Sequence, residues 1–178
     1  RTGLQANFIK RVLTSQPQIQ LLPPDEVARP LRGGPGVYEA AIVQRPSQRI
    51  LTIDQWQTIL RTMQARPDVV VATPTMTGSA LAVRGAASRS ITISGIDPAP
   101  YFAIVRVPDY IVAGEPRLDS DDILIGTELA KDLGVVIGDK LNISTALGDG
   151  RVLTIRGIFD LGNKGANLRT TFVALRTA

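Results

Sequence analysis

The chain of 178 residues contains no histidine and no cysteine. Without these side chains the usual zinc, haem and iron–sulfur sites have no ligands, and neither a histidine-based triad nor a cysteine nucleophile can be built. The lack of cysteine also excludes a disulfide framework, which leaves both oxidising and reducing compartments open. We therefore expect no metal, no cofactor and no enzymatic activity.

Aromatic residues make up only 4% of the chain, and no apolar run reaches the roughly 18 residues that a membrane span needs. The net charge of +4 would fit a nucleic-acid partner. However, residues 1–66 carry nine Lys/Arg against four Asp/Glu, whereas residues 67–178 carry eleven against twelve. Because the basic residues are not interleaved with aromatic side chains that stack on bases, we expect no nucleic-acid partner.

The chain does have the length and the apolar content of a folded domain, with 44% hydrophobic and 20% charged residues. We expect a single domain over residues 1–178. Within it we expect two lobes, formed by residues 1–22 plus 37–97 and by residues 110–178, with a Pro/Gly-rich loop at 23–36. Since the chain starts with Arg1 and carries no signal-peptide pattern, we also expect it to be a piece of a longer protein.

The N-terminal third predicts short elements. The hydrophobic period indicates an amphipathic helix near residues 4–13 and strands at 19–22, 37–44 and 49–53. Asp54 is expected to cap a helix over residues 55–66 that ends before Pro67. One face of this helix carries Trp56, Ile59, Leu60 and Met63. Such a stripe is typical of a helix packed on a core, and the alternative is a hydrophobic groove in which Trp56 and Met63 contact a substrate or partner.

From residue 68 the apolar period falls to two, which predicts strands at 69–74, 76–84 and 88–95, the last two joined by a turn at Gly85. A helical turn at 100–106 and a connector at 110–114 follow. The last third predicts a strand at 123–125, a helix at 128–133 that ends at Gly134, and strands at 140–146, 151–159 and 170–175. Strands in groups with a few short helices predict an α+β fold with a mixed sheet and a second, smaller β-rich lobe.

Three patterns invite a chemical interpretation. The acidic stretch 119–122 could hold calcium, but Leu124 and Ala130 stand where a calcium loop needs glycine and glutamate. Gly34-Pro35-Gly36 and residues 162–165 complete no phosphate-binding motif, and we expect both to be loops. Lysines are present for a Ser/Lys dyad, but the spacings of known nucleophile motifs are absent. A hydrolase that uses the acidic stretch therefore stays only a rival hypothesis.

From residue 94 onward the chain resembles a known family. An ordered set of segments carries the resemblance: Ser94-Gly95-Ile96-Asp97-Pro98, Ile111-Val112-Ala113-Gly114, residues 122–135, residues 137–141 and residues 152–159. This order resembles that of extracytoplasmic domains of ABC transporter permeases of the lipoprotein-releasing (Lol-type) and macrolide-exporter (MacB-type, FtsX-like) group. The motif positions read as structural, at turns and caps: Gly95, Asp97, Pro98, Gly114, Gly126, Gly134, Gly138 and Asp139.

The resemblance implies a periplasmic core domain inserted between the first two of four membrane helices of a bacterial inner-membrane protein. It implies partners as well: an ABC ATPase subunit or domain that hydrolyses ATP, a second permease in a dimer, and a periplasmic protein. In such a protein the domain would couple helix motion to export or release of a lipoprotein or other hydrophobic substrate without catalysing a reaction. The alternative is a stand-alone secreted or periplasmic binding module for a small apolar ligand.

The chain departs from the Lol-type pattern in one place. The subunit that captures the lipoprotein chaperone carries a long protruding loop between the two strands that follow its Gly-Asp motif. Here that place holds only residues 146–150. Since so short a turn cannot form a hook, we expect a non-hook subunit or a transporter of another substrate.

Overall fold

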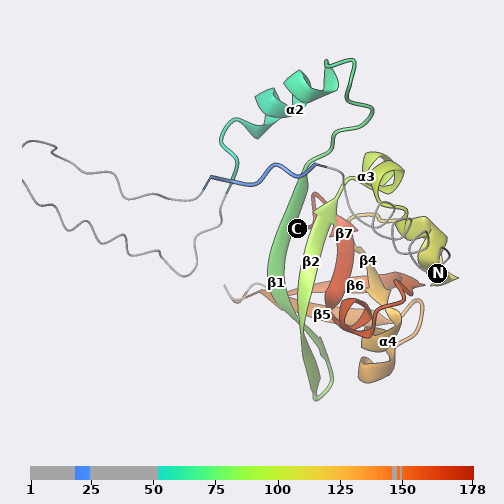
Figure 1. Ribbon diagram of the computed structural model, residues 1–178. Coiled ribbons are helices and arrows are strands. Elements are labelled where there is room, and N and C mark those ends of the chain that lie inside the picture. Colours follow the sequence, from blue (N-terminus) through green and yellow to red (C-terminus); the bar gives the residue numbers. More distant parts are fainter. Residues whose placement is uncertain (1–18, 25–51, 146–147, 149) are drawn as a thin grey trace, which may run out of the picture.

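The computed structural model describes residues 19–24, 52–145, 148 and 150–178 (Figure 1). The helix expected near 4–13, the strand expected at 37–44 and most of the loop 23–36 lie outside these residues. The described elements are, in chain order, α2 (Trp56–Gln64), β1 (Thr75–Arg84), β2 (Ala87–Ile96), α3 (Pro98–Ile104), the 3-10 helix η1 (Val107–Tyr110), β3 (Ile111–Gly114), β4 (Asp122–Gly126), α4 (Thr127–Leu133), β5 (Lys140–Thr145), β6 (Gly150–Phe159), α5 (Lys164–Arg169) and β7 (Thr170–Ala174).

The described strands form one mixed sheet in the order β3-β6-β4-β7-β2-β1-β5. β5 pairs with β6 as well as with β1, so six strands close on themselves, and β3 is added to the C-terminal part of β6. The pairs β2–β7 and β4–β6 are parallel, and the other pairs are antiparallel. The predicted α+β class with a mixed sheet is therefore confirmed, and the division into two lobes stays a prediction.

The longest local element is the β1–β2 hairpin, which the sequence predicts correctly. Its register pairs Arg84 with Ala87 across a two-residue turn, in which Gly85 has a φ of +57°. A turn of this kind requires positive φ, which glycine adopts without a steric penalty. The alternation of small and apolar residues then places Ala80, Ala82 and Ile91 in the core.

Each face of the sheet carries its own hydrophobic core. The first core joins α4 to the strands and contains Leu129 and Leu133 with Ile123, Ile125 and Val173, among others. The second core lies under α3 and η1, where Val105 and Val107 meet Leu124, Phe159 and Phe172. β4 is buried along its whole length because alternate residues face opposite cores. This strand therefore ties the two cores into one body.

The strand–helix unit β4–α4 matches the sequence prediction closely. Gly126 is the N-cap of α4, and Leu129, Ala130 and Leu133 face the first core. Gly134 follows the helix with a φ of +61°, and the Val135 N–H donates back to the Ala130 carbonyl at 2.9 Å. This left-handed residue ends the helix as a C-cap glycine does.

Five local predictions are wrong. Residues 19–22 and 69–74 form no strand, because no described strand pairs with them and Pro67 and Pro74 bracket the second of the two. The strand predicted at 49–53 lies mostly outside the described residues. The cap of α2 is Gln55, in a left-handed conformation without a side-chain cap, and not Asp54. The loop predicted at 162–165 overlaps the start of α5 at Lys164, and the connector at 110–114 contains the edge strand β3. No described helix has the length and hydropathy to span a membrane.

Candidate partner-contact site

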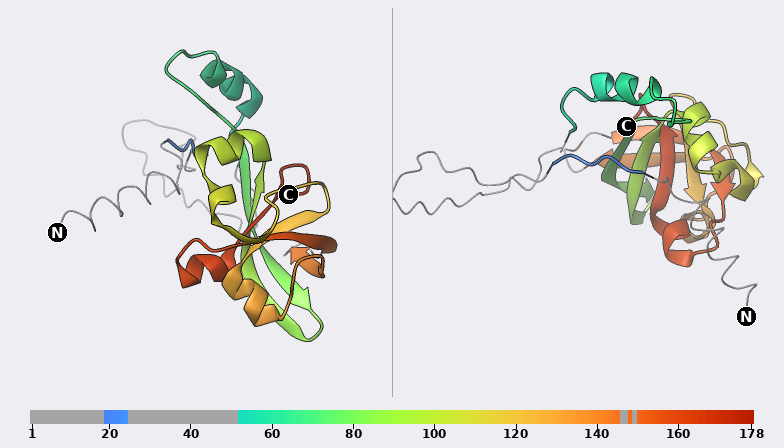
Figure 2. Two further views of the ribbon diagram at one scale, coloured as in Figure 1. Left: turned by 90° about the vertical axis from the view of Figure 1, so that its right-hand side faces the viewer. Right: turned by 45° about the horizontal axis from the view of Figure 1, so that its top comes forward.

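The predicted contact residues Trp56 and Met63 lie on α2, which stands beyond the ends of β1 and β2 in Figures 1 and 2. We call residues 56–74 the arm. No residue of α2 is buried, and Trp56 keeps 40% of its surface exposed. The helix is held to the following segment by a bond from the Gln64 side chain to the Ala72 carbonyl at 3.2 Å. The apolar stripe thus exists but reaches neither core.

The rest of the arm carries two basic residues, Arg61 and Arg66, against one acidic residue, Asp68, and it includes the apolar run 69–72, in which Val70 is 96% exposed. Arg66 donates to Asp68 through two bonds of 2.9 and 2.7 Å, and this guanidinium lowers the pKa of the Asp68 carboxyl. Both partners are exposed, so the pair adds little to stability. Arg61 lies in the last turn of α2, and the first turn carries no acidic residue. Of the stripe, Trp56 is exposed, whereas Ile59, Leu60 and Met63 are half-buried. The exposed Trp56 and Val70 side chains are suited to contact another surface.

Neither of the two described cavities involves the arm. The first, of about 210 Å³, is bordered by Tyr101, Tyr110 and Phe172 on the α3 side of the sheet, and burial raises the pKa of the Tyr101 hydroxyl. The second, of about 460 Å³, lies between Arg89 of β2 and Arg169 of α5. Trp56 and Met63 line neither, so the described cavities lend no support to a ligand groove at the arm.

The family-motif residues occupy the ends of elements. Gly134 and the pair Gly138-Asp139 flank the turn between α4 and β5. The others lie where a strand ends or a helix begins: Gly95 near the end of β2, Asp97 as N-cap of α3 with Pro98 as its first residue, Gly114 at the end of β3 and Gly126 at the end of β4. The structure does not bring these residues together at one site. Their structural interpretation agrees with these positions.

Asp139 fixes the turn between α4 and β5. Its carboxylate accepts the Val136 N–H at 3.0 Å and the Arg84 guanidinium at 2.6 Å. These two bonds, the backbone bond first, lower the pKa of the Asp139 carboxyl. Arg84 also donates to the Gly134 carbonyl at 2.9 Å, so one side chain at the end of β1 holds both ends of the turn. Sequence reasoning missed Arg84, because its partners lie 50 and 55 residues away.

Gly126 is required by a close approach. A Cβ at this position would overlap the backbone of Asn167 in α5. Asn167 is buried, accepts the Leu161 N–H at 2.9 Å and donates to Asp160 at 2.7 Å. The candidate phosphate loop at 162–165 overlaps the start of α5, whose N-cap Asn163 accepts the Ala166 N–H at 3.1 Å. The Asn163 side chain is therefore used within the chain.

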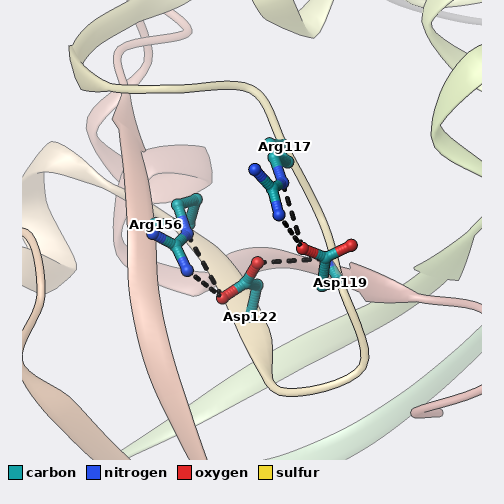
Figure 3. Close-up of polar contacts among 4 residues, drawn as sticks. All are labelled: Arg117, Asp119, Asp122 and Arg156. Carbon is teal, nitrogen blue, oxygen red and sulfur yellow. Dashed lines mark hydrogen bonds and ion pairs between the residues drawn. The ribbon is translucent and has the colours of Figure 1, made fainter.

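The acidic stretch is a structural turn (Figure 3). Asp122 is only 3% exposed and accepts three hydrogen bonds, from Arg156 at 3.0 and 3.3 Å and from the Asp119 N–H at 3.0 Å. Arg117 donates to Asp119 at 2.5 Å and lowers the pKa of that carboxyl. Since each of these two carboxylates faces a guanidinium, the stretch lacks the cluster of free oxygens that calcium needs. Within the described part of the chain no group of three or more acidic residues could hold a metal ion.

The segment that follows β7 is anchored on the same turn. The Thr177 hydroxyl donates to the Ser120 carbonyl at 2.6 Å, and the Leu175 N–H donates to the Ile96 carbonyl at 2.8 Å. Arg151 of β6 reaches the Thr177 carbonyl at 3.4 Å. The end of the described chain is thus tied to β2, to β6 and to the turn before β4. No local sequence signal indicates these contacts.

Comparison with known proteins gives relatives of one kind. Over 101 residues the chain is 29% identical to the lipoprotein-releasing system transmembrane protein LolC of Neisseria meningitidis serogroup B, a match that spans 55% of this chain and 24% of LolC. The fold is similar to the extracellular domain of the noncanonic ABC-type transporter YknZ from Gram-positive bacteria, with a TM-score of 0.54 and 16% identity over 67% of this chain and 62% of that one. It is also similar to a domain of a permease protein from Porphyromonas gingivalis, with a TM-score of 0.52 and 23% identity over 66% and 56% of the two chains.

The structural likeness shows a shared fold. β5 and β6 already pair at Ser144 and Gly150, and the expectation of a subunit without a hook stays a prediction. The strongest evidence on identity covers nearly the whole sequence. The family of MacB-like periplasmic core domains matches residues 3–178. The chain therefore belongs to the MacB-like periplasmic core domain family.

Proposed function

We propose that the chain is the extracytoplasmic, non-catalytic domain of an ABC transporter permease in a bacterial inner membrane. The match of the MacB-like periplasmic core domain family over residues 3–178 carries this proposal. The partner that hydrolyses ATP is an ABC ATPase subunit or domain on the other side of the membrane, and the working unit contains two permeases. The domain passes the ATP-driven motion of the membrane helices to a lipoprotein or other hydrophobic substrate outside.

The packing of the domain supports transmission of motion. Because β4 is buried on both faces, the two cores move as one body rather than as two layers. Thr177 and Leu175 bond to the turn before β4 and to β2, so a displacement at the end of β7 is passed to the sheet at two separated points. Close-packed interiors have low compressibility and transmit strain.

Among the relatives described above, LolC has a name that states a substrate class, lipoproteins. One experiment separates lipoprotein release from export of another hydrophobic substrate. In cells depleted of the parent permease, mass spectrometry compares the lipoproteins retained in the inner membrane, and ethidium accumulation reports export of a hydrophobic cation. Retained lipoproteins support the release function that the name LolC describes. Raised ethidium without retained lipoproteins supports an exporter. If depletion changes neither lipoprotein retention nor ethidium accumulation, and the permease does not co-purify with an ABC ATPase, the proposed function is wrong.

The coupling role needs a test in the complete permease with its ATPase. Thr177→Val removes the hydroxyl bond to the Ser120 carbonyl and keeps the side-chain shape. Transport per ATP hydrolysed is expected to fall while the ATPase rate persists. Thr52→Val is the matched control, because the Thr52 side chain is exposed and makes no hydrogen bond within the described residues. An equal fall in both variants would contradict the coupling role of the Thr177 contact.

A further inference from the structure

The N-terminal half of β1 has an edge that no described strand covers. β1 pairs with β2 along all of its ten residues, but its other edge meets β5 only from Ala80 to Val83. Residues 75–79 are exposed, and within the described part of the chain nothing pairs with this outer side. We call residues 75–79 the open β1 edge.

The ladder register shows which backbone groups of the edge are free. Arg84 and Ala87 flank the two-residue turn and form its first hydrogen-bonded pair, so every second residue from Arg84 bonds to β2. The intervening residues point the other way, and Leu81 and Val83 face Ser144 and Asn142 of β5. By the same alternation, the backbone N–H and C=O groups of three residues point outward, where no described strand pairs with them: Thr75, Thr77 and Ser79.

The open β1 edge differs from the other uncovered edges of the sheet. Free edges are usually guarded by charge, by short length or by a bulge. The uncovered part of β2 carries Arg89, which is ion-paired with Asp132 of α4. β3 has four residues and an irregular register between Ile111 and Ala113. Residues 75–79, with the sequence Thr-Met-Thr-Gly-Ser, have no charge, no proline and no bulge.

We propose that the open β1 edge pairs with the same edge of a second copy of this chain. An antiparallel pair centred on Thr77 places Thr77 opposite its counterpart and Thr75 opposite Ser79 of the second copy. In this register the three residues with free backbone groups face one another as hydrogen-bonded pairs, and threonine and serine hydroxyls meet across the strands. The edge is therefore complementary to itself without any change of backbone conformation.

The two ends of the edge limit this pairing to five residues. At one end Pro74 cannot donate a backbone hydrogen bond, and the chain there leaves the sheet toward the arm. At the other end β5 begins to cover β1 at Ala80, which pairs with Thr145. In the symmetric arrangement β5 of one copy meets the position where the other copy's residues 71–74 have already left the sheet. Each copy thus leaves five residues of its edge without a described strand partner, which is the number of residues that this register pairs.

Five paired residues bury less than the roughly 1,200 Å² of a standard stable complex, so separate chains pair weakly. A membrane region that holds two permeases side by side would raise the local concentration into the millimolar range, at which weak pairing is populated. This biological setting rests on the permease pair proposed above. The pairing itself is tested on chain 1–178 alone, so its failure leaves the proposed function standing.

Single-cysteine crosslinking tests the register directly, because the chain has no cysteine. Hydrogen-bonded antiparallel pairs have Cα atoms about 5.5 Å apart, within disulfide range. Thr77→Cys is therefore expected to form a disulfide dimer under mild oxidation at high protein concentration. Thr75→Cys and Ser79→Cys alone are expected not to, because each lies about 13 Å from its own counterpart. A mixture of the Thr75→Cys and Ser79→Cys chains is expected to crosslink, because the register places Thr75 of one copy opposite Ser79 of the other.

Val112→Cys on β3 is the matched control for random collision, since Val112 is also on an uncovered edge and 60% exposed. The proposal is overturned if Thr77→Cys crosslinks no more than Val112→Cys, or if Thr75→Cys alone crosslinks as well as Thr77→Cys. NMR on the unsubstituted chain tests the pairing by a second measurement. The amide signals of Thr75, Thr77 and Ser79 are expected to shift with protein concentration, and Thr77→Lys, which opposes two like charges, is expected to abolish the shift. Concentration-independent amides at these three positions would equally refute the pairing.

Discussion

Replacing Asp122 by alanine tests whether the acidic turn is structural. The substitution removes a nearly buried carboxylate that accepts two bonds from Arg156 and one from the Asp119 N–H. A hydrogen bond to a charged group contributes about 1.5–3 kcal/mol. The Arg156 side chain is 42% exposed and can be rehydrated, so its full contribution is not lost. We therefore expect the free energy of unfolding to fall by about 2–4 kcal/mol.

For a domain of this size each kcal/mol shifts Tm by about 2–4 °C, so Asp122→Ala is expected to lower Tm by roughly 5–15 °C. Urea denaturation followed by circular dichroism measures the free energy, and a thermal melt measures Tm. The matched control is Asp121→Ala in the same turn. The Asp121 side chain is exposed and only its backbone carbonyl is bonded, to the Thr154 N–H at 2.7 Å. This variant is expected to change stability by less than about 0.5 kcal/mol.

A loss below about 1 kcal/mol for Asp122→Ala, or an equal loss for Asp121→Ala, would refute the reasoning. A double-mutant cycle with Arg156→Met isolates the ion pair, and residues in contact through such a pair are expected to show coupling of at least about 0.5 kcal/mol. Additive effects would mean that the pair shown in Figure 3 contributes nothing to stability.

Three further predictions concern the helix junction, the α4–β5 turn and the arm. Gly126→Ala is expected to destabilise the domain by about 1–3 kcal/mol in urea denaturation, because the new Cβ overlaps the Asn167 backbone, and a loss below about 0.5 kcal/mol would contradict that contact. The folded-state pKa of Asp139 is lowered, so its stabilising contribution is present above the unfolded-state pKa and is lost as pH falls through the folded-state value. Denaturation from pH 7 to pH 3 should therefore show a shallower loss for Asp139→Asn than for the parent chain, and parallel curves would disprove the assignment. Trp56→Ala is expected to lower the free energy of unfolding by less than about 1 kcal/mol, whereas Leu124→Ala in the second core is expected to lower it by about 2–5 kcal/mol. Similar losses for the two variants in thermal melts would show that the arm packs on the body.

The motif residues show how far sequence reasoning reached at the site. Gly134 and Gly138 were recognisable because each stands at a chain reversal with positive φ, a local requirement that the sequence itself displays. Gly126 was recognisable as a helix cap, but its reason is the approach of α5 from 41 residues further along the chain. The partners Arg84 and Arg156 carried no local signal. An arginine on a strand is a common solvent-facing residue until the fold brings a carboxylate to it.

The limits of the sequence predictions have different physical causes. Residues 19–22 and 69–74 have the composition of strands, but a strand exists only when another strand supplies its hydrogen bonds. Trp56 and Met63 were expected on a helix and lie on one, yet the pattern could not say whether that face meets a core. α5 was missed because a helix of six residues is too short to show a helical period in the sequence.

By itself, the sequence determined the elements that depend on neighbours along the chain. These are the β1–β2 hairpin with its turn at Gly85, the β4–α4 unit that ends at Gly134, and the order of motifs that marks the family. Only the tertiary structure decided which strands are neighbours, that β5 closes the sheet onto β6, and that no described strand covers the outer edge of residues 75–79. Local conformation is set by turn chemistry and periodicity over a few residues, whereas strand neighbours are chosen by burial and hydrogen bonding between segments far apart in the chain.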